Sequence, residues 1–105
     1  MSVYIVIEAK VKDQKKYNQY ITAFSEIIAH YGGRYLVRGD HVTPLDEGMK
    51  PERRQPERMI ILEFPSAVNL RRCFASPEYQ AIVSLRHAGA DTRAVLLDGY
   101  RPEDR

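Results

Sequence analysis

The chain is poor in cysteine, with one residue, Cys73, among 105. A single thiol excludes an intrachain disulfide and any metal site built from several cysteines. Because Cys73 lies in an apolar stretch with helical spacing, we interpret it as a buried, unreactive thiol rather than a nucleophile. The three histidines do not show the spacing of metal ligands. We therefore expect no metal and no other cofactor.

An excess of one charge is also lacking. The 16 basic and 14 acidic residues are interspersed and leave a net charge of +2. So small a net charge does not indicate a nucleic-acid or membrane partner. No apolar run reaches transmembrane length, and Met1 leads directly into a strand pattern without a basic leader. We expect a cytoplasmic protein with neither of these partners.

What is present is an ordinary globular mixture, 44% hydrophobic and 29% charged. This length predicts one domain, which we place at residues 1–100, followed by a polar tail at 101–105. Apolar and β-branched patterns predict strands at residues 3–11, 34–38, 59–64 and 94–97.

Helical signals fill two of the intervals between these strands. Asp13 is a plausible N-cap for a helix whose apolar residues recur up to Gly32-Gly33. Ser66 can cap a short helix through Phe74, and Ser76-Pro77 starts another. The stretch from 40 to 57 holds three prolines and many charges, which predicts a long loop. The pattern leaves open whether this loop is merely mobile or acts as a lid.

The order strand, helix, strand, strand, helix, strand is the split βαβ pattern of α+β, ferredoxin-like folds. Right-handed crossovers place the helices on one face of a four-stranded antiparallel sheet. The third and fourth strands are nevertheless apolar on both faces. Covering several hundred Å² of apolar sheet is worth several kcal/mol at about 25 cal/mol per Å². We therefore expect a homodimer in which two sheets face each other.

Polar side chains are expected to gather on the face turned away from the helices. We take the first and third strands as adjacent, central and parallel, which puts Glu8 beside Glu63 at one end of this face. Arg34 should lie opposite Glu63. Arg38 should follow on the same face, with His30 and Arg93 approaching the same end.

Two interpretations of this cluster stay open. Glu8, Glu63 and Arg34 can form a structural network that fixes the register at a dimer interface. Alternatively, a carboxylate and His30 carry out acid–base chemistry on a small substrate while an arginine holds its anionic group.

Several segments resemble the domain-of-unknown-function 1330 family, in the right order and over roughly Val3 to Gly99. They are Tyr4–Glu8, His30–Gly39, Leu62–Ser66 and Ser76–Gln80. The resemblance implies the dimeric α/β-barrel superfamily, in which two ferredoxin-like sheets face each other. The family-like polar residues here are Glu8, His30, Arg38, Glu63, Ser76, Tyr79 and Arg86. The loop departs from the family pattern: Met49 stands where a tryptophan is common, and Asp40 replaces a second glycine.

The leading hypothesis is a small-molecule-handling protein, in the form of a cofactor-free monooxygenase or isomerase with a pocket beside the sheet. Relatives in the implied superfamily carry out such chemistry, which is an argument from fold. The alternative is a non-catalytic homodimer that binds a small anionic or aromatic ligand or regulates a neighbour. RNA binding is not favoured, because the sheet lacks the aromatic residues that stack bases. The candidate catalytic residues are His30 and Glu63, and the candidate substrate-binding residues are Glu8, Arg34, Arg38, Tyr79 and Arg86.

Overall fold

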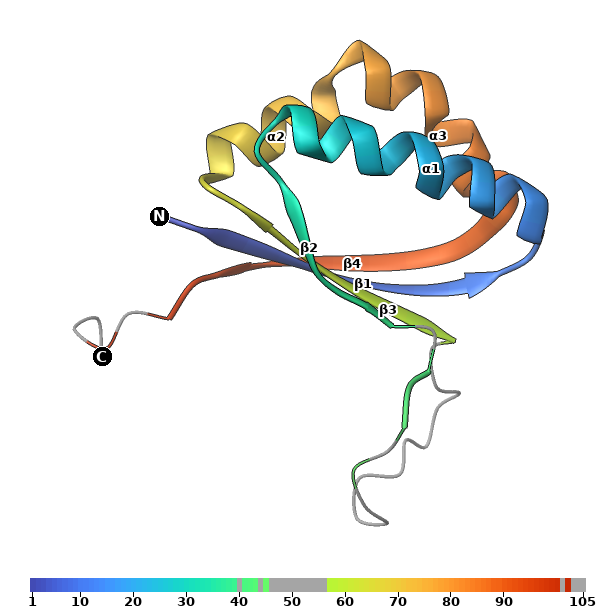
Figure 1. Cartoon of the computed structure of the whole chain (residues 1–105), viewed down its shortest axis with the longest axis horizontal. Coiled ribbons are helices and arrows are strands. Elements are labelled where there is room, and N and C mark those ends of the chain that lie inside the picture. The colour runs from blue at the N-terminus through green and yellow to red at the C-terminus, as the bar shows by residue number, and fades with distance from the viewer. Residues whose placement is uncertain (40, 44, 46–56, 101, 103–105) are drawn as a thin grey trace.

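The computed structural model describes residues 1–39, 41–43, 45, 57–100 and 102. In these residues four strands and three helices follow one another in the predicted order (Figure 1). Their bounds are β1 Val3–Val11, α1 Gln14–His30, β2 Arg34–Gly39, β3 Arg58–Phe64, α2 Ala67–Ala75, α3 Pro77–Gly89 and β4 Ala90–Asp98. The predicted loop lies almost wholly outside the described residues, as does most of the tail.

Helix starts follow the capping signals in the sequence. The side chain of Asp13 accepts a hydrogen bond from the backbone N–H of Lys16 at 3.1 Å. Ser66 caps α2 in the same way, and Ser76 caps α3 ahead of Pro77. Gly32 follows α1 with a φ of 81°, the left-handed conformation that glycine adopts at little cost.

The sheet has the strand order β2-β3-β1-β4, and every neighbouring pair is antiparallel. The ferredoxin-like prediction is therefore confirmed, but the expectation that the first and third strands are parallel was wrong. A right-handed crossover makes β1 parallel to β2, and β3 pairs antiparallel with β2, so β3 runs opposite to β1. In the observed register Tyr4 pairs with Glu63, while Glu8 pairs with Met59.

All three helices cover one face of the sheet, here called the inner face (Figure 1). The main core lies between the two layers, and its most deeply buried side chains come from α1, β3 and α2. These are Phe24, Ile28, Leu62, Phe64 and Cys73. Burial raises the pKa of the Cys73 thiol to about 11, which fits the interpretation of an unreactive group.

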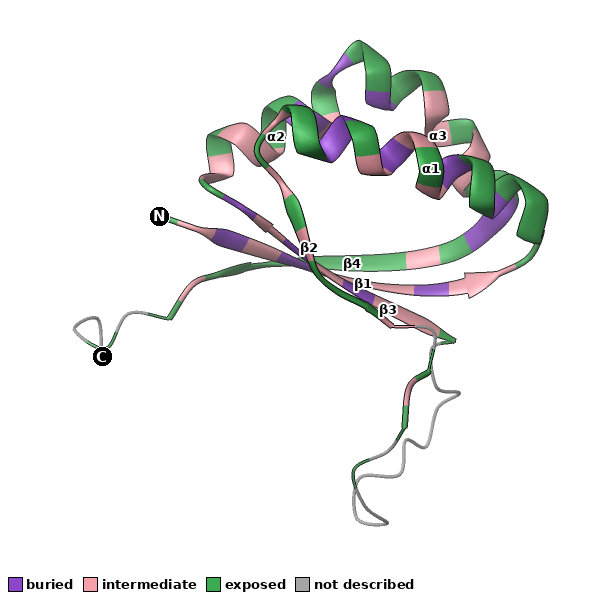
Figure 2. Cartoon of the chain, in the orientation of Figure 1, coloured by how far each residue is buried: buried purple, intermediate pink, exposed green. Residues whose placement is uncertain are grey.

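The opposite face, here called the outer face, has no covering layer among the described residues. It carries apolar side chains from every strand: Tyr4, Val6, Val37, Met59, Ile61, Val95 and Leu97. Val95 and Leu97 are 57% and 50% exposed. Figure 2 shows how β4 remains exposed along most of its length. The prediction of strands that are apolar on both faces is confirmed.

β4 is longer than the sequence indicated, because it begins at Ala90 instead of Ala94. The polar residues Asp91, Thr92 and Arg93 do not continue the apolar pattern that identified the strand. It is nevertheless paired with β1 over its whole length, from Val11–Ala90 to Val3–Asp98. An edge strand tolerates such polar residues because one side of it meets solvent.

No helix in the described part of the chain is long and apolar enough to cross a membrane.

Candidate functional site

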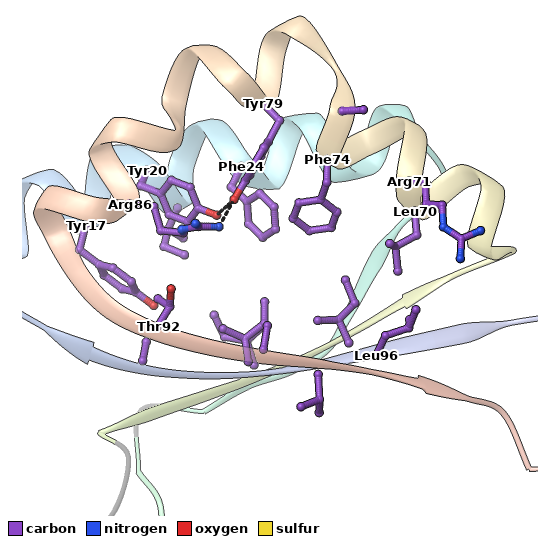
Figure 3. Close-up of a pocket in the computed structure, with 18 residues that line it drawn as sticks. Tyr17, Tyr20, Phe24, Leu70, Arg71, Phe74, Tyr79, Arg86, Thr92 and Leu96 are labelled. Atoms are coloured by element: carbon purple, nitrogen blue, oxygen red, sulfur yellow. Dashed lines mark hydrogen bonds between the residues drawn. The ribbon is translucent and has the colours of Figure 1, made fainter.

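A cavity of about 600 Å³ lies between the inner face of the sheet and the helices. Its walls are mostly aliphatic and aromatic, and Figure 3 shows the rings of Tyr17, Tyr20, Phe24, Phe74 and Tyr79 along the helical side. The sheet provides the floor through Ile5, Ile7, Ala9 and Ile60. Exposed lining residues, Arg71 on α2 with Ala94 and Leu96 on β4, mark its mouth.

Three polar side chains meet on one wall of this cavity. Arg86 Nη1 donates a hydrogen bond to the Tyr79 hydroxyl at 2.6 Å. The Tyr79 hydroxyl lies 3.1 Å from that of Tyr20, with which it shares a second hydrogen bond. The hydroxyl ends of both tyrosines and the guanidinium converge in Figure 3. We call these three residues the Arg86 cluster.

The Arg86 cluster lacks hydrogen-bond acceptors for some of its own donors. Burial, followed by the neighbouring Tyr79, raises the pKa of Tyr20, so its hydroxyl keeps its proton at any physiological pH. Arg86 Nε is shielded from solvent and has no hydrogen-bond partner among the described residues. A buried donor left unpaired costs about 1–3 kcal/mol. The cluster is therefore an energetically costly arrangement.

The packing of α1 against α3 fixes this cluster. Tyr20 projects from α1, whereas Tyr79 and Arg86 lie two turns apart on the same face of α3. The Ser76 hydroxyl accepts a hydrogen bond from the Tyr79 N–H at 3.1 Å, which sets the first turn of α3. At the other end of α3, Gly89 lies directly against the backbone of Tyr17. The Gly89 contact sets the distance between α1 and α3 at that end of the cavity.

Two of the residues predicted to bind substrate, Tyr79 and Arg86, line the cavity. The predicted catalytic residue Glu63 lies on the outer face instead. It accepts hydrogen bonds from Arg34 Nε at 2.7 Å and from the Tyr4 hydroxyl at 3.2 Å. Arg34 pairs with Glu63 as predicted. The sheet itself separates this ion pair from the cavity.

Glu8 shares the outer face with Glu63 but lies at its opposite end. The expectation that the two carboxylates are neighbours was wrong, because it followed from the parallel pairing of β1 with β3. Glu8 pairs instead with Met59 and Arg93, and Arg93 accordingly lies far from Glu63. His30 is exposed at the end of α1 and contacts the ring of Tyr31. The structure does not bring His30, Glu8 and Glu63 together.

Arg38 points to the inner side, and the expectation that it shares a face with Arg34 was wrong. A β-bulge between Tyr35 and Val37 adds one residue to β2 and reverses the alternation beyond it. The Arg38 guanidinium consequently stacks over the Tyr35 ring, 4.8 Å from its centroid. It borders a separate depression of about 210 Å³ that also includes Arg58.

Apart from Tyr79, the residues of the aromatic wall were not among the predicted site residues. Tyr17, Tyr20 and Phe24 belong to the apolar residues that recur at helical spacing before Gly32-Gly33, and they are buried as that spacing predicts. That spacing identifies the inner face of a helix, but it does not reveal whether the space facing it is filled. The sequence contained no signal that α3 would contact α1 while leaving room above β4.

Solved structures with similar folds come from several bacteria. A protein of unknown function from Rhodopseudomonas palustris, RPA0582, has a TM-score of 0.80 at 18% identity, covering 96% of this chain and 84% of its own. A dabb family protein with a ferredoxin-like fold from Mesorhizobium loti has a TM-score of 0.67 at 10% identity, with coverages of 95% and 98%. SnoaB, a cofactor-independent oxygenase from Streptomyces nogalater, has a TM-score of 0.65 at 10% identity, with coverages of 99% and 98%.

At such identities these likenesses show a shared fold. No curated protein matches the chain. A family model, Domain of unknown function (DUF1330), matches residues 2–100. The match spans every strand and helix described above, and the chain belongs to this DUF1330 family.

Proposed function

We propose that this protein binds a small, largely apolar molecule in the cavity between its helices and the inner face of its sheet. The observation that carries the proposal is a space of about 600 Å³ whose wall is apolar except for a few convergent polar groups. Ligand sites in proteins commonly have this size and make-up. The aromatic side chains on the helical wall favour a flat ring system, because rings gain from stacked and edge-on contacts.

The Glu63–Arg34 pair is assigned a structural role in this proposal. It lies on the outer face, and its charges already satisfy each other. The candidate ligand-binding residues are Tyr79 and Arg86, whereas Glu8, His30, Arg34, Arg38 and Glu63 lie away from the cavity.

The proposed form of the protein is a homodimer with its outer faces packed together. The exposed apolar residues of β4 and the apolar centre of the sheet would be buried in that arrangement. Ferredoxin-like proteins of similar fold from Thermobifida fusca and Bacteroides fragilis are dimeric, which supports a dimer. A membrane or nucleic-acid partner is not part of the proposal, and we place the protein in the cytoplasm.

Catalysis of the cofactor-free oxygenase type is a second candidate, favoured by the half-buried guanidinium of Arg86 at the cavity wall. Such a cation would stabilise the oxygen anion of an enolate or phenolate, which can then give electrons to O₂. The fold shared with SnoaB agrees with this candidate. However, the described lining holds no carboxylate or imidazole to remove a proton. Binding is therefore the better-supported function, and isomerase chemistry, which needs a base, is less so.

A cavity-filling variant tests the proposal. Ala94→Trp would place an indole at the mouth of the cavity, and we expect it to abolish binding of 2-naphthamide, measured by calorimetric titration. Ala81→Trp is the matched control, because Ala81 is exposed on α3 and does not line the cavity. Equal binding by both variants, or no binding by the unmodified protein, would contradict the proposal. Oxygen uptake with 2-tetralone, an enolisable aromatic ketone, distinguishes the oxygenase from the binding protein.

A further inference from the structure

The hydrogen bonds within the Arg86 cluster leave donors without acceptors. Tyr20 and Tyr79 share one hydrogen bond, which uses one of their two phenolic hydrogens. Arg86 can only donate, so it offers nothing to the second hydrogen. Among the described residues, neither phenol donates to any other group. One phenolic O–H therefore has no hydrogen-bond acceptor, and neither does the N–H of Arg86 Nε.

The planar guanidinium of Arg86 favours a ligand group of a particular shape. Its Nη1 is committed to the Tyr79 hydroxyl, whereas Nε belongs to a different edge of the planar guanidinium. That edge matches the two oxygens of a carboxylate, which arginine binds through parallel hydrogen bonds once the side chain turns its shielded Nε toward the cavity. In apolar surroundings such charge-assisted bonds are stronger than they are in water.

A second arginine at the same cavity lies in a different environment. Arg71 is an exposed residue of α2, at the mouth. Solvent competes for its guanidinium, so it should contribute little to ligand selection. The deeper wall thus carries a single cation, with no described acid beside it. One guanidinium balances a monoanion, whereas a phosphate dianion would leave a buried charge unpaired.

We propose that the Arg86 cluster is the recognition site for the acid group of the ligand, and that the ligand is a small aromatic monocarboxylate. Its carboxylate contacts Arg86 and the phenol pair, and its ring lies along the aromatic wall of the cavity. This inference rests on the proposed function, namely that the cavity binds a small apolar molecule. It adds the chemical class of the ligand and its orientation.

A matched pair of probes tests this, namely 2-naphthoate and 2-naphthamide, which differ in charge but hardly in shape. At pH 7 we expect the unmodified protein to bind the carboxylate about tenfold or more tightly than the amide. Arg86→Met should abolish that preference and leave the affinity for the amide within about twofold. Arg71→Met, the same change at the mouth, should keep the preference.

The thermal stability of Arg86 variants distinguishes a role in ligand recognition from a structural role. Arg86 carries an unpaired buried donor, so Arg86→Met should leave the thermal midpoint unchanged or raise it. A large fall in the midpoint would assign Arg86 a structural role and overturn the inference. Arg86→Lys keeps the charge without the planar edge, and it should show an intermediate preference even if the methionine variant fails to fold.

Each of the remaining outcomes would contradict the inference, the proposed orientation or the proposed function. Equal binding of both probes by the unmodified protein would overturn the inference while leaving the proposed function intact. A preference that survives Arg86→Met but disappears in Arg71→Met would place the acid group at the mouth, and it would overturn the proposed orientation. Binding of neither probe would contradict the proposed function, and the inference would fail with it.

Discussion

Two arginines on opposite faces of the sheet have contrasting surroundings. Arg34 is exposed and holds Glu63 at 2.7 Å, an ion pair open to solvent on the arginine side. Arg86 has a phenol for its partner and a buried Nε without one. An unpaired buried donor lowers stability, and natural proteins accept such costs at functional sites. At the residue scale, therefore, the unsatisfied arginine indicates function and the satisfied one indicates stability.

Glu63 provides a test of the structural role through pH. The Arg34 guanidinium, with further hydrogen bonds from Ser2 and Tyr4, holds the pKa of this carboxyl below its ordinary value of 4.5. A lowered pKa in the folded state means that the stabilisation is complete above about 4.5. It is lost as the pH falls through the folded-state pKa. We expect the unmodified protein to lose more free energy of unfolding between pH 6 and pH 3 than Glu63→Gln does.

Urea unfolding at the two pH values measures this difference. Glu26→Gln on α1 is the control, because Glu26 is an exposed carboxylate without a described ion pair. Glu63→Gln should also leave ligand binding in the cavity unchanged, since the sheet separates the two. Loss of ligand binding in this variant would return Glu63 to the candidate catalytic residues.

At the scale of elements, most of the fold could be predicted from the sequence. Capping residues and apolar spacing identified every helix start, and the strand order followed from the split βαβ pattern. The candidate site could not be predicted equally well, for two physical reasons. One bulge, between Tyr35 and Val37, moved Arg38 to the other face of β2, and a bulge depends on the pairing of two strands rather than on one segment. The cavity depends on how far α3 stands from β4, which no local pattern encodes.

The closeness of α1 and α3 is itself testable at Gly89. A Cβ on this residue would lie 2.8 Å from the backbone nitrogen of Tyr17, and backbone atoms cannot turn aside as a side chain can. We expect Gly89→Ala to push the helices apart and to destabilise the protein by about 1–3 kcal/mol. Gly39→Ala is the matched control, because its Cβ would meet its nearest neighbour at an ordinary 3.5 Å. Similar unfolding midpoints for the two variants in urea would show that the contact between α1 and α3 accommodates the added Cβ without loss of stability.

At the scale of the whole molecule, the two faces of the sheet have different surroundings. The inner face meets the helices and the cavity, and its core is closed by buried residues of β1 and β3. The outer face has apolar side chains without a covering layer in the described part of the chain (Figure 2). A stable interface between proteins buries about 1,200–2,000 Å² in total, which a pair of four-stranded sheets can supply. Ligand binding and self-association can thus occur on opposite sides of one sheet without competing.

A charge placed on the outer face tests the homodimer. Leu97 is 50% exposed on β4, so Leu97→Asp should cost the single chain little. In a symmetric dimer the change would bury an unpaired carboxylate from each copy, and the dissociation constant should rise by about 100-fold or more. Val68→Asp is the control, because Val68 is 56% exposed on α2, on the other side of the molecule. Sedimentation equilibrium should give twice the chain mass for the unmodified protein and for Val68→Asp, and a single chain mass for Leu97→Asp. If Leu97→Asp keeps the doubled mass, the outer face is not the interface, and a single-chain mass for the unmodified protein would remove the dimer from the proposal.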